Sequence, residues 1–344
     1  MKSKKAFTLI ELLVVIAIIG ILATISVIAL QNARAKSRDA KRAGDIKQVQ
    51  TALELFFNDK NRYPTAAEWN AGQIYSTSTA GTSTYMQVIP SAPAPADGSC
   101  SSGGNSFSYR SESDSTYTIS FCLGNTTGTL SAGKKCATPG GILDESCCSG
   151  SVSYGGEVYD VVEVGDQCWL DRNLNVGTMV SGVTEQTDND IIEKYCLSDT
   201  SSNCDDRGGI YQWDEVMGYV ETEGAQGICP TGWHVPTDAE YDTLISYVGA
   251  NGFSGTEATA LKEAIIWWGG TGTDDFGFTL IPNGQRELDG SFYAGGGAGQ
   301  FTLLWSSSLD GSSAWYRIVY RDYSWVTRGS ADHGYGDSVR CLKD

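Results

Sequence analysis

The pattern of hydrophobic and polar positions begins with an uninterrupted apolar run. Residues 12–30 are apolar apart from Thr24 and Ser26. At about 1.5 Å of rise per residue, a helix over this run is roughly 29 Å long. That length matches a bilayer core of about 30 Å, so we predict a membrane span over residues 12–30.

The helical pattern continues past the apolar run as a stripe of apolar residues spaced three or four positions apart. The stripe consists of Ile46, Val49, Leu53 and Phe56. No proline occurs before Pro64, so we predict one helix over residues 7–60 whose second half packs on a folded domain. A plain membrane anchor with a charged stalk is the alternative.

Short alternating segments replace the helical pattern after residue 60. Period-two alternation in residues 106–122 predicts antiparallel strands, within a small β head over residues 61–130. Residues 131–151 are rich in Gly and Ser and lack periodicity, which is typical of a linker. Residues 152–344 show short strands, many aromatic residues and Gly-rich loops. The chain is therefore expected to be α+β.

One helix is predicted inside the C-terminal region. Thr237 is an N-cap candidate, and Glu240 three residues later completes a capping box. The apolar residues that follow fall on one face of a helix, so we expect it to be packed. They are Tyr241, Leu244, Ile245 and Val248.

Charge is distributed unevenly along the 344 residues. Residues 1–60 carry 10 Lys and Arg against 5 Asp and Glu, and the remainder carries 14 against 36. Basic residues flank the apolar run on both sides, so charge alone leaves its orientation open, although Lys2, Lys4 and Lys5 favour a cytoplasmic N-terminus. The acidic remainder argues against nucleic acid as its partner.

The 10 cysteines are typical of disulfides in an oxidising compartment. The expected pairs are Cys100 with Cys122, Cys196 with Cys204, and Cys229 with Cys341. The pairing of Cys136, Cys147, Cys148 and Cys168 stays open, with Cys168 the expected outside partner for one of the others. Zinc is disfavoured because the spacing contains no CxxC and no nearby His.

Glu11 stands near the start of the apolar run. An ionisable side chain in a span costs on the order of 3 kcal/mol and usually has a partner. The nearest cations in the sequence are Lys4 and Lys5. If the chain is cut after Ala6, the new amine of Phe7, on a neighbouring subunit, supplies a counter-charge for Glu11.

The basic leader (residues 1–6) followed by FTLIELLVVIAIIGILA resembles the type IV prepilin class, which includes pilins and the pseudopilins of type II secretion. The resemblance implies cleavage by prepilin peptidase between Ala6 and Phe7, N-methylation of Phe7, and docking into a filament through Glu11. Ala6 stands where glycine is usual, and Ile28 stands where many major pilins have proline. The second departure disfavours a standard major pilin.

Residues 152–344 resemble the Fibrobacter succinogenes major paralogous domain, an extracellular bacterial module. The motifs that carry this resemblance include EVYDVVEVGDQCWLDRNLNVG, CPTGWHVPTDAEYDTLISYVG and GYGDSVRCLKD. The resemblance implies a C-type-lectin-like fold similar to that of formylglycine-generating enzymes. It specifies the architecture better than the biochemistry.

Catalysis is not expected. The two histidines, His234 and His333, are read as structural and solvated, respectively. Formylglycine-generating enzymes need reactive cysteines, whereas Cys229 and Cys341 are expected to be paired. No catalytic motif such as GxSxG or HExxH occurs.

No cofactor is expected, and calcium is the one ion that the acidic loops suit. Asp274 and Asp275 are the best candidate ligands, ahead of residues 187–190 and 205–206. No EF-hand spacing is present.

Aromatic residues concentrate in the last forty positions, where exposed rings suit stacking on sugars or anchoring of a protein partner. Tyr323, Trp325 and Tyr335 are the candidate ligand-binding residues, because they fall in loops.

These observations predict a pilin-like filament subunit, minor or at the tip, that displays a lectin-like module for adhesion or partner recognition. Its expected partners are other pilin or pseudopilin subunits, prepilin peptidase, and a carbohydrate or surface protein. We expect it in the cytoplasmic membrane before assembly and outside the cell afterwards. The alternatives are a pseudopilin of type II secretion and an anchored enzyme of the formylglycine-generating type.

Overall fold

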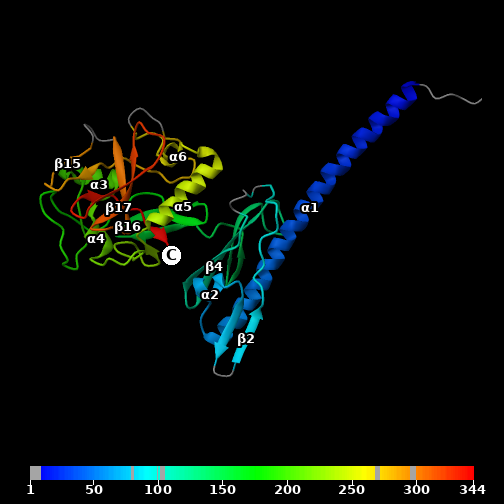
Figure 1. Cartoon of the computed structure of the whole chain (residues 1–344), viewed down its shortest axis with the longest axis horizontal. Helices are drawn as coiled ribbons and strands as arrows, with labels where there is room; N and C mark the ends of the chain where they lie inside the picture. Colours follow the sequence, from blue (N-terminus) through cyan, green and yellow to red (C-terminus); the bar gives the residue numbers. More distant parts are fainter. Residues whose placement is uncertain (1–8, 79–80, 99, 101–104, 268–271, 295–299) are drawn as a thin grey trace, which may run out of the picture. The chain divides into compact units, whose positions relative to one another are not determined.

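The computed structural model divides the chain into two compact units, residues 1–147 and 148–344 (Figure 1). A long helix followed by small, mostly antiparallel sheets confirms the α+β prediction. The residues that the structure describes are 9–78, 81–98, 100, 105–267, 272–294 and 300–344.

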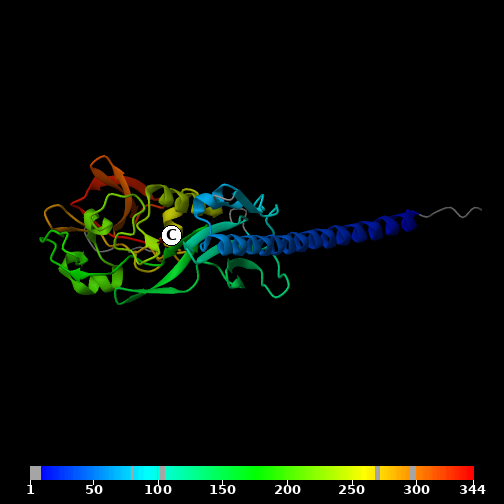
Figure 2. The ribbon, with the colours of Figure 1, turned by 90° about the horizontal axis from the view of Figure 1, so that it is seen from below.

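The first unit is built on one helix, α1 (Leu9–Lys60), which runs without a break in both ribbon views (Figures 1 and 2). Every residue from 12 to 30 is exposed on it. Within the described part of the chain, α1 is the one helix long and apolar enough to cross a membrane. The second half of α1 instead buries the predicted stripe, from Ile46 to Phe56, against the sheets of the unit.

The head of the first unit contains α2 (Ala66–Asn70), a two-stranded hairpin and a four-stranded antiparallel sheet. The Thr65 side chain caps α2 in a capping box with Glu68. The hairpin consists of β1 (Ile74–Ser78) and β2 (Gly81–Met86). The sheet consists of β3 (Ser108–Ser113), β4 (Thr116–Leu123), β5 (Gly133–Thr138) and β6 (Gly141–Leu143), in that order.

The segment 131–151, expected as a linker, contains regular structure. Its strands β5 and β6 extend the sheet of the first unit, and β5 pairs along β4 from Gly133 to Ala137. Backbone hydrogen bonds to a neighbouring strand form these strands even though the Gly- and Ser-rich sequence carries little alternation. The division between the units falls between Cys147 and Cys148.

A buried ion-pair network fixes α1 to the head. Arg42 is fully buried and contacts Asp39 at 2.6 Å and Asp97 at 3.3 Å, and Arg38 also pairs with Asp97. Asp39 in turn accepts the backbone N–H of Gly124 at 2.9 Å. Two of the basic residues that follow the apolar run, Arg38 and Arg42, are therefore paired with carboxylates inside the unit.

The second unit packs short strands and helices around two main hydrophobic clusters. A five-stranded sheet has the order β13 (Trp233–His234), β20 (Leu342–Lys343), β9 (Gln167–Leu170), β8 (Glu157–Val164) and β7 (Ser151–Tyr154). A four-stranded sheet has the order β12 (Tyr211–Gln212), β19 (Gly336–Asp337), β14 (Gln285–Arg286) and β15 (Phe292–Tyr293). A three-stranded sheet consists of β16 (Phe301–Asp310), β17 (Ser313–Tyr320) and β18 (Thr327–Asp332).

The remaining elements of this unit are short. The parallel pair consists of β10 (Thr178–Met179) and β11 (Glu193–Lys194). The helices are η1 (Leu197–Asp199), α3 (Ser201–Arg207), α4 (Trp213–Met217), α5 (Asp238–Val248), η2 (Gly249–Phe253) and α6 (Glu257–Leu261). Helix α5 has the predicted capping box of Thr237 and Glu240. Of the four apolar residues predicted to pack, it buries Tyr241, Leu244 and Val248 and leaves Ile245 partly buried.

Five disulfides join all 10 cysteines. Three of them are the pairs expected from the sequence: Cys100 with Cys122, Cys196 with Cys204, and Cys229 with Cys341. The four left open pair as Cys136 with Cys147 and Cys148 with Cys168. The division between the units falls between Cys147 and Cys148, and each of these two cysteines forms its disulfide within its own unit.

Candidate functional site

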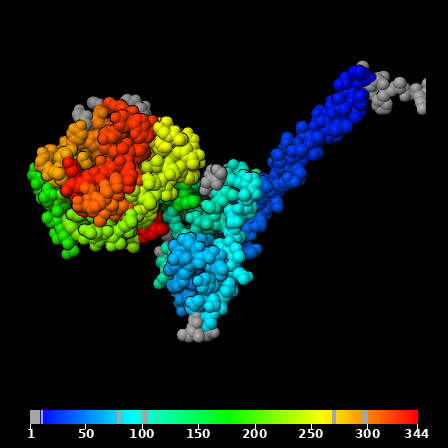
Figure 3. All heavy atoms as spheres, in the orientation of Figure 1, coloured from blue at the N-terminus to red at the C-terminus, as the bar shows by residue number. Residues whose placement is uncertain are grey.

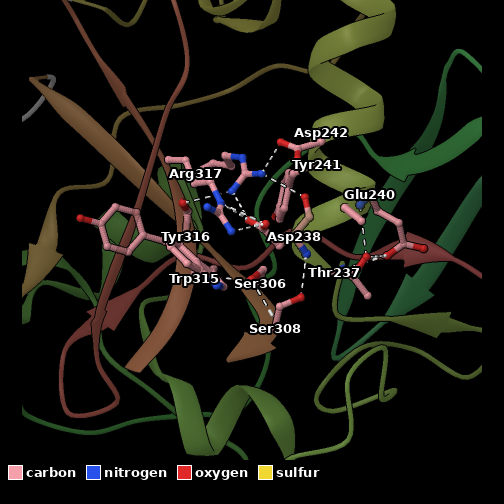
Figure 4. Close-up of polar contacts among 12 residues, drawn as sticks. Thr237, Asp238, Glu240, Tyr241, Asp242, Ser306, Ser308, Trp315, Tyr316 and Arg317 are labelled. Carbon is pink, nitrogen blue, oxygen red and sulfur yellow. Dashed lines mark hydrogen bonds and ion pairs between the residues drawn. The ribbon is translucent and has the colours of Figure 1, made fainter. Parts of the chain in front are cut away.

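The sheet of β16, β17 and β18 has two different faces, and one of them is committed to packing. On this back face, Leu304 and Val319 belong to the hydrophobic cluster that contains α5. Arg317, also on the back face, bonds to Asp238 and to Asp242 at 2.6 Å, as Figure 4 shows. Helix α5 therefore holds the sheet rigidly from behind.

The polar residues next to this contact complete the attachment. Ser308 Oγ accepts the backbone N–H of Asp238 at 2.9 Å, and Ser306 Oγ donates to the carbonyl oxygen of Trp315 at 2.8 Å (Figure 4). The Arg328 guanidinium lies 3.3 Å from the ring centroid of Trp315 and pairs with Asp238 at 2.7 Å. The ring of Trp315 is thus covered on one side by Arg328.

The front face of the same sheet carries cross-strand pairs of apolar residues. Phe301 lies opposite Tyr320, and Leu303 lies opposite Ile318. Phe301, Leu303 and Ile318 form a small hydrophobic cluster of their own, with Tyr316 packed against it. The segment from β16 to the last strand, coloured orange to red in Figure 3, covers the central part of the surface of the second unit that is visible there.

Five aromatic rings form a continuous row, and we call the row the aromatic ladder. It begins on β15, continues over the first residue of β16 and the last residue of β17, and ends in the loop between β17 and β18. Successive ring centroids are 5.5, 6.0, 5.2 and 4.7 Å apart. Four of the five side chains are between 39% and 55% exposed, and the exception is Phe301. The last two rings are stacked, with an angle of 10° between their planes. The ladder consists of Tyr293, Phe301, Tyr320, Tyr323 and Trp325.

A surface cavity of about 400 Å³ opens beside the ladder. Its floor includes Leu303, Ile318 and Tyr316, and its walls include Gln285 from β14 and the loop residues 321–323. Arg321 and Asp322 in that loop form an ion pair at 2.8 Å, so their charges offset each other. The site therefore combines aromatic faces with amide, hydroxyl and carboxylate groups, a combination that suits sugars and small polar ligands.

The loop that carries Tyr323 and Trp325 is anchored from below by Lys262. The Lys262 ammonium is fully buried and donates to the backbone carbonyls of Arg321 at 2.8 Å and Tyr323 at 2.7 Å. It also lies 5.0 Å from the ring centroid of Trp267. These contacts fix the loop conformation that aligns the last rings of the ladder.

Burial lowers the pKa of Lys262 from 10.5 to about 8, although the charge of Asp322 opposes the change. Between these two pH values the unfolded chain binds more protons at this site than the folded chain, so folding stability rises with pH. We expect Lys262→Met to remove this rise, which amounts to at most about 3 kcal/mol. Urea unfolding of wild type and variant from pH 7 to pH 10 measures it, and parallel stability profiles would contradict the assignment.

The three aromatic residues predicted from the sequence to bind a ligand lie in different surroundings. Tyr323 and Trp325 lie next to each other in the ladder. Tyr335 does not belong to it, because its side chain packs against the main hydrophobic cluster. Sequence reasoning missed Tyr293 and Tyr320, whose exposure shows only once β15, β16 and β17 are brought together.

The proposed calcium ligands are engaged in local contacts. Asp274 accepts the backbone N–H of Thr279 at 2.7 Å and its hydroxyl at 3.0 Å, and Asp275 accepts the hydroxyl of Thr273. Across the described ranges, no group of three or more His, Cys, Asp or Glu residues is arranged to hold a metal ion. The structure therefore gives no support to calcium at these loops.

The imidazole of His234 lies between two carboxylates. Its Nδ1 lies 2.8 Å from Asp344 and its Nε2 lies 3.1 Å from Glu240. Burial disfavours the charged imidazole, but the contacts with Glu240 and Asp344 outweigh it and raise the pKa of His234. His333 is not simply solvated, because its Nδ1 lies 3.0 Å from Asp214.

The residues predicted for processing lie at the start of the chain. Ala6 and Phe7 are outside the described residues, and so is the side chain of Glu11, whose backbone belongs to α1. Cleavage, N-methylation and docking at these residues stay predictions.

Comparison with known proteins identifies both ends of the chain. Residues 1–27 match the family model of the prokaryotic N-terminal methylation motif. The N-terminal segment is therefore that of the pilin and pseudopilin class. Residues 162–343, more than half of the chain, match the model of the Fibrobacter succinogenes major domain, and the chain belongs to that family. No solved structure matches the chain.

Curated relatives share the N-terminal region. The type II secretion system core protein G of Aeromonas hydrophila is 39% identical over 67 residues, which are 20% of this chain and 47% of that protein. The type IV major pilin protein PilA of Myxococcus xanthus is 42% identical over 59 residues, 17% of this chain and 27% of that pilin. Fimbrial protein Q of Moraxella bovis is 40% identical over 84 residues, which are 24% of this chain and 54% of that protein. The chain thus spans about half or less of the length of these relatives.

Proposed function

We propose that this chain is a minor or tip subunit of a type IV pilus-like filament, and that it binds a glycan through the aromatic ladder of its second unit. The observation that supports binding is the ladder itself, in which four of the five rings are exposed and the central ones, Phe301 and Tyr320, belong to a sheet that α5 fixes from behind. Rigid, exposed aromatic rings bind flat ligand faces at low cost in conformational entropy.

The first unit supplies the attachment. The exposed apolar half of α1 needs a cover, which is the cytoplasmic membrane before assembly and neighbouring pilin-like subunits afterwards. We propose that prepilin peptidase removes residues 1–6 and exposes the amine of Phe7. A second unit of 197 residues on every copy would crowd a packed shaft, so a minor or tip position fits better than the bulk subunit.

A pseudopilin of type II secretion is the second candidate. The 39% identity to type II secretion system core protein G over 67 residues supports it, but fimbrial protein Q matches equally well over 84 residues, so the comparisons do not separate the two candidates. Both candidates assemble into a filament, and they differ in whether that filament belongs to a pilus or to a type II secretion system. The enzyme alternative needs free cysteines, whereas the structure joins Cys229 to Cys341.

A glycan array probed with the full chain in detergent tests the binding function. We expect at least one glycan class to bind, and the double variant Tyr323→Ala with Trp325→Ala to lose roughly tenfold or more in affinity, since two stacking faces disappear. Tyr75→Ala, at an exposed ring in the first unit, is the control and keeps full binding. A blank array, or binding that survives the double variant, would overturn the glycan proposal.

A further inference from the structure

A buried carboxyl group lies behind the cavity beside the aromatic ladder. Asp337 on β19 is fully buried, and neither of its carboxyl oxygens has a well-formed hydrogen bond to the described residues. The side chain of Gln285 interacts with this carboxyl group and lowers its pKa. A buried carboxyl group without well-formed hydrogen bonds destabilises the folded protein, so its presence points to a function.

Strand register places Asp337 on the cavity side of the sheet. Arg286 pairs with Gly336, so the next antiparallel pair sets Gln285 opposite Asp337, with both side chains on one face. Gln285 also pairs with Tyr293 across β14 and β15, and both line the cavity. Tyr293, Gln285 and Asp337 therefore form one cross-strand row that leads from the ladder to the buried carboxyl.

The second sheet supports the same placement. Ser338 is bridged to Leu304, which lies on the back face of β16, so the preceding Asp337 points to the side of Leu303. Leu303 is part of the cavity floor. Tyr316, also in the floor, is close enough for the charge of Asp337 to act on it.

The electrostatics around the cavity favour a cation. Among the residues that line it, Arg321 is the one basic side chain in the described structure, and it is paired with Asp322. Arg286, next to Gln285, faces the other way and bonds to Glu185 and Gly182. The second unit as a whole carries 30 Asp and Glu against 10 Lys and Arg.

We propose that the cavity binds the ammonium group of an amino sugar, with tyrosine rings around the cation and Asp337 beneath it. The ligand displaces the half-buried side chain of Gln285 and reaches the carboxyl group. Ammonium groups are attracted both to aromatic faces and to a carboxylate in a desolvated site. This proposal rests on the glycan-binding function proposed above and names the class of sugar.

Binding of the cation is coupled to release of a proton. Burial, with a smaller contribution from the charge of Glu287, raises the pKa of Asp337 well above its ordinary value, and Gln285 opposes the change only in part. Burial therefore favours the neutral form of the carboxyl group when no cation is bound. When the ammonium group enters, the carboxyl proton leaves to solvent and the carboxylate pairs with the ammonium.

Calorimetry on the full chain in detergent, at slightly acidic pH, tests the inference with three oligosaccharides of the same length and β-1,4 linkage. They are a glucosamine oligomer, its fully N-acetylated counterpart and a glucose oligomer. We expect the glucosamine oligomer to bind roughly tenfold more tightly than the others. Titration in two buffers of different ionisation enthalpy should show proton release with this ligand alone.

Asp337→Asn should remove both the preference and the proton release, whereas Asp310→Asn, at an exposed carboxylate on β16, should leave them unchanged. If Asp337→Asn fails to fold, preference and proton release in the wild type decide the question. Equal affinities without proton release would overturn the amino-sugar inference and leave glycan binding intact. Failure of the glucosamine oligomer to bind also overturns it, and a blank glycan array contradicts the glycan-binding function as well.

Discussion

Glu11→Val is expected to abolish incorporation of the subunit into filaments while leaving the protein in the membrane. The substitution makes the apolar run easier to insert, by on the order of 3 kcal/mol, because it removes a carboxylate from the span. Assembly is lost because the amine of Phe7 on a neighbouring subunit no longer meets a counter-charge. The measurement compares the subunit in sheared filaments with the subunit in the membrane fraction, using mass spectrometry to identify a methylated Phe7 as the N-terminus.

Thr24→Val is the matched control for this prediction. It also removes a polar group from the apolar half of α1, but the Thr24 hydroxyl only donates to the carbonyl oxygen of Ile21 in the preceding turn. We therefore expect normal assembly of this variant. Incorporation of Glu11→Val at the wild-type level would refute the docking role, and an intact Met1 in mature filaments would refute leader cleavage.

The features of the chain that local sequence determines were predictable. The stripe from Ile46 to Phe56 is visible as a helical period, and the structure buries it. The capping box of Thr237 and Glu240 involves residues three positions apart, so its signal survives whatever the rest of the chain does. The methylation motif is likewise contained in residues 1–27.

Features that depend on pairing between distant segments were not predictable. Tyr293 and Tyr320 are ordinary strand residues in the sequence, and they join one ladder only because both contact Phe301 on β16. Asp337 follows glycine and tyrosine in a segment that reads as a turn, whereas three-strand pairing buries it. Strand β5 was likewise not predictable from the Gly- and Ser-rich composition of residues 131–151, because it forms through backbone hydrogen bonds to β4.

Whether the acidic loops bind calcium was not predictable for a different reason. Asp274 and Asp275 have the side chains that calcium prefers. In the structure, however, they accept hydrogen bonds from Thr279 and Thr273 within their own loop. Composition reveals which groups are present, but the conformation of the loop decides whether they are available to an ion.

Removal of the disulfide between Cys229 and Cys341 is expected to cause the largest loss of stability in the second unit. The two cysteines are 112 residues apart and fully buried. In the loop-entropy description, a closure of this size stabilises by about 5 kcal/mol, whereas a closure of eight residues stabilises by about half as much. For a unit of this size, Cys229→Ala with Cys341→Ala should lower the Tm by roughly 10 to 20 °C.

The double variant Cys196→Ala with Cys204→Ala is the matched control, because its disulfide spans only 8 residues in the same unit. Its Tm should fall by about half as much, and equal losses for the two variants would contradict the loop-size argument. Thiol titration of the native wild-type chain separates this prediction from the enzyme alternative. Two reactive thiols at Cys229 and Cys341 would favour a catalyst of the formylglycine-generating type, whereas an unreactive pair would contradict that alternative.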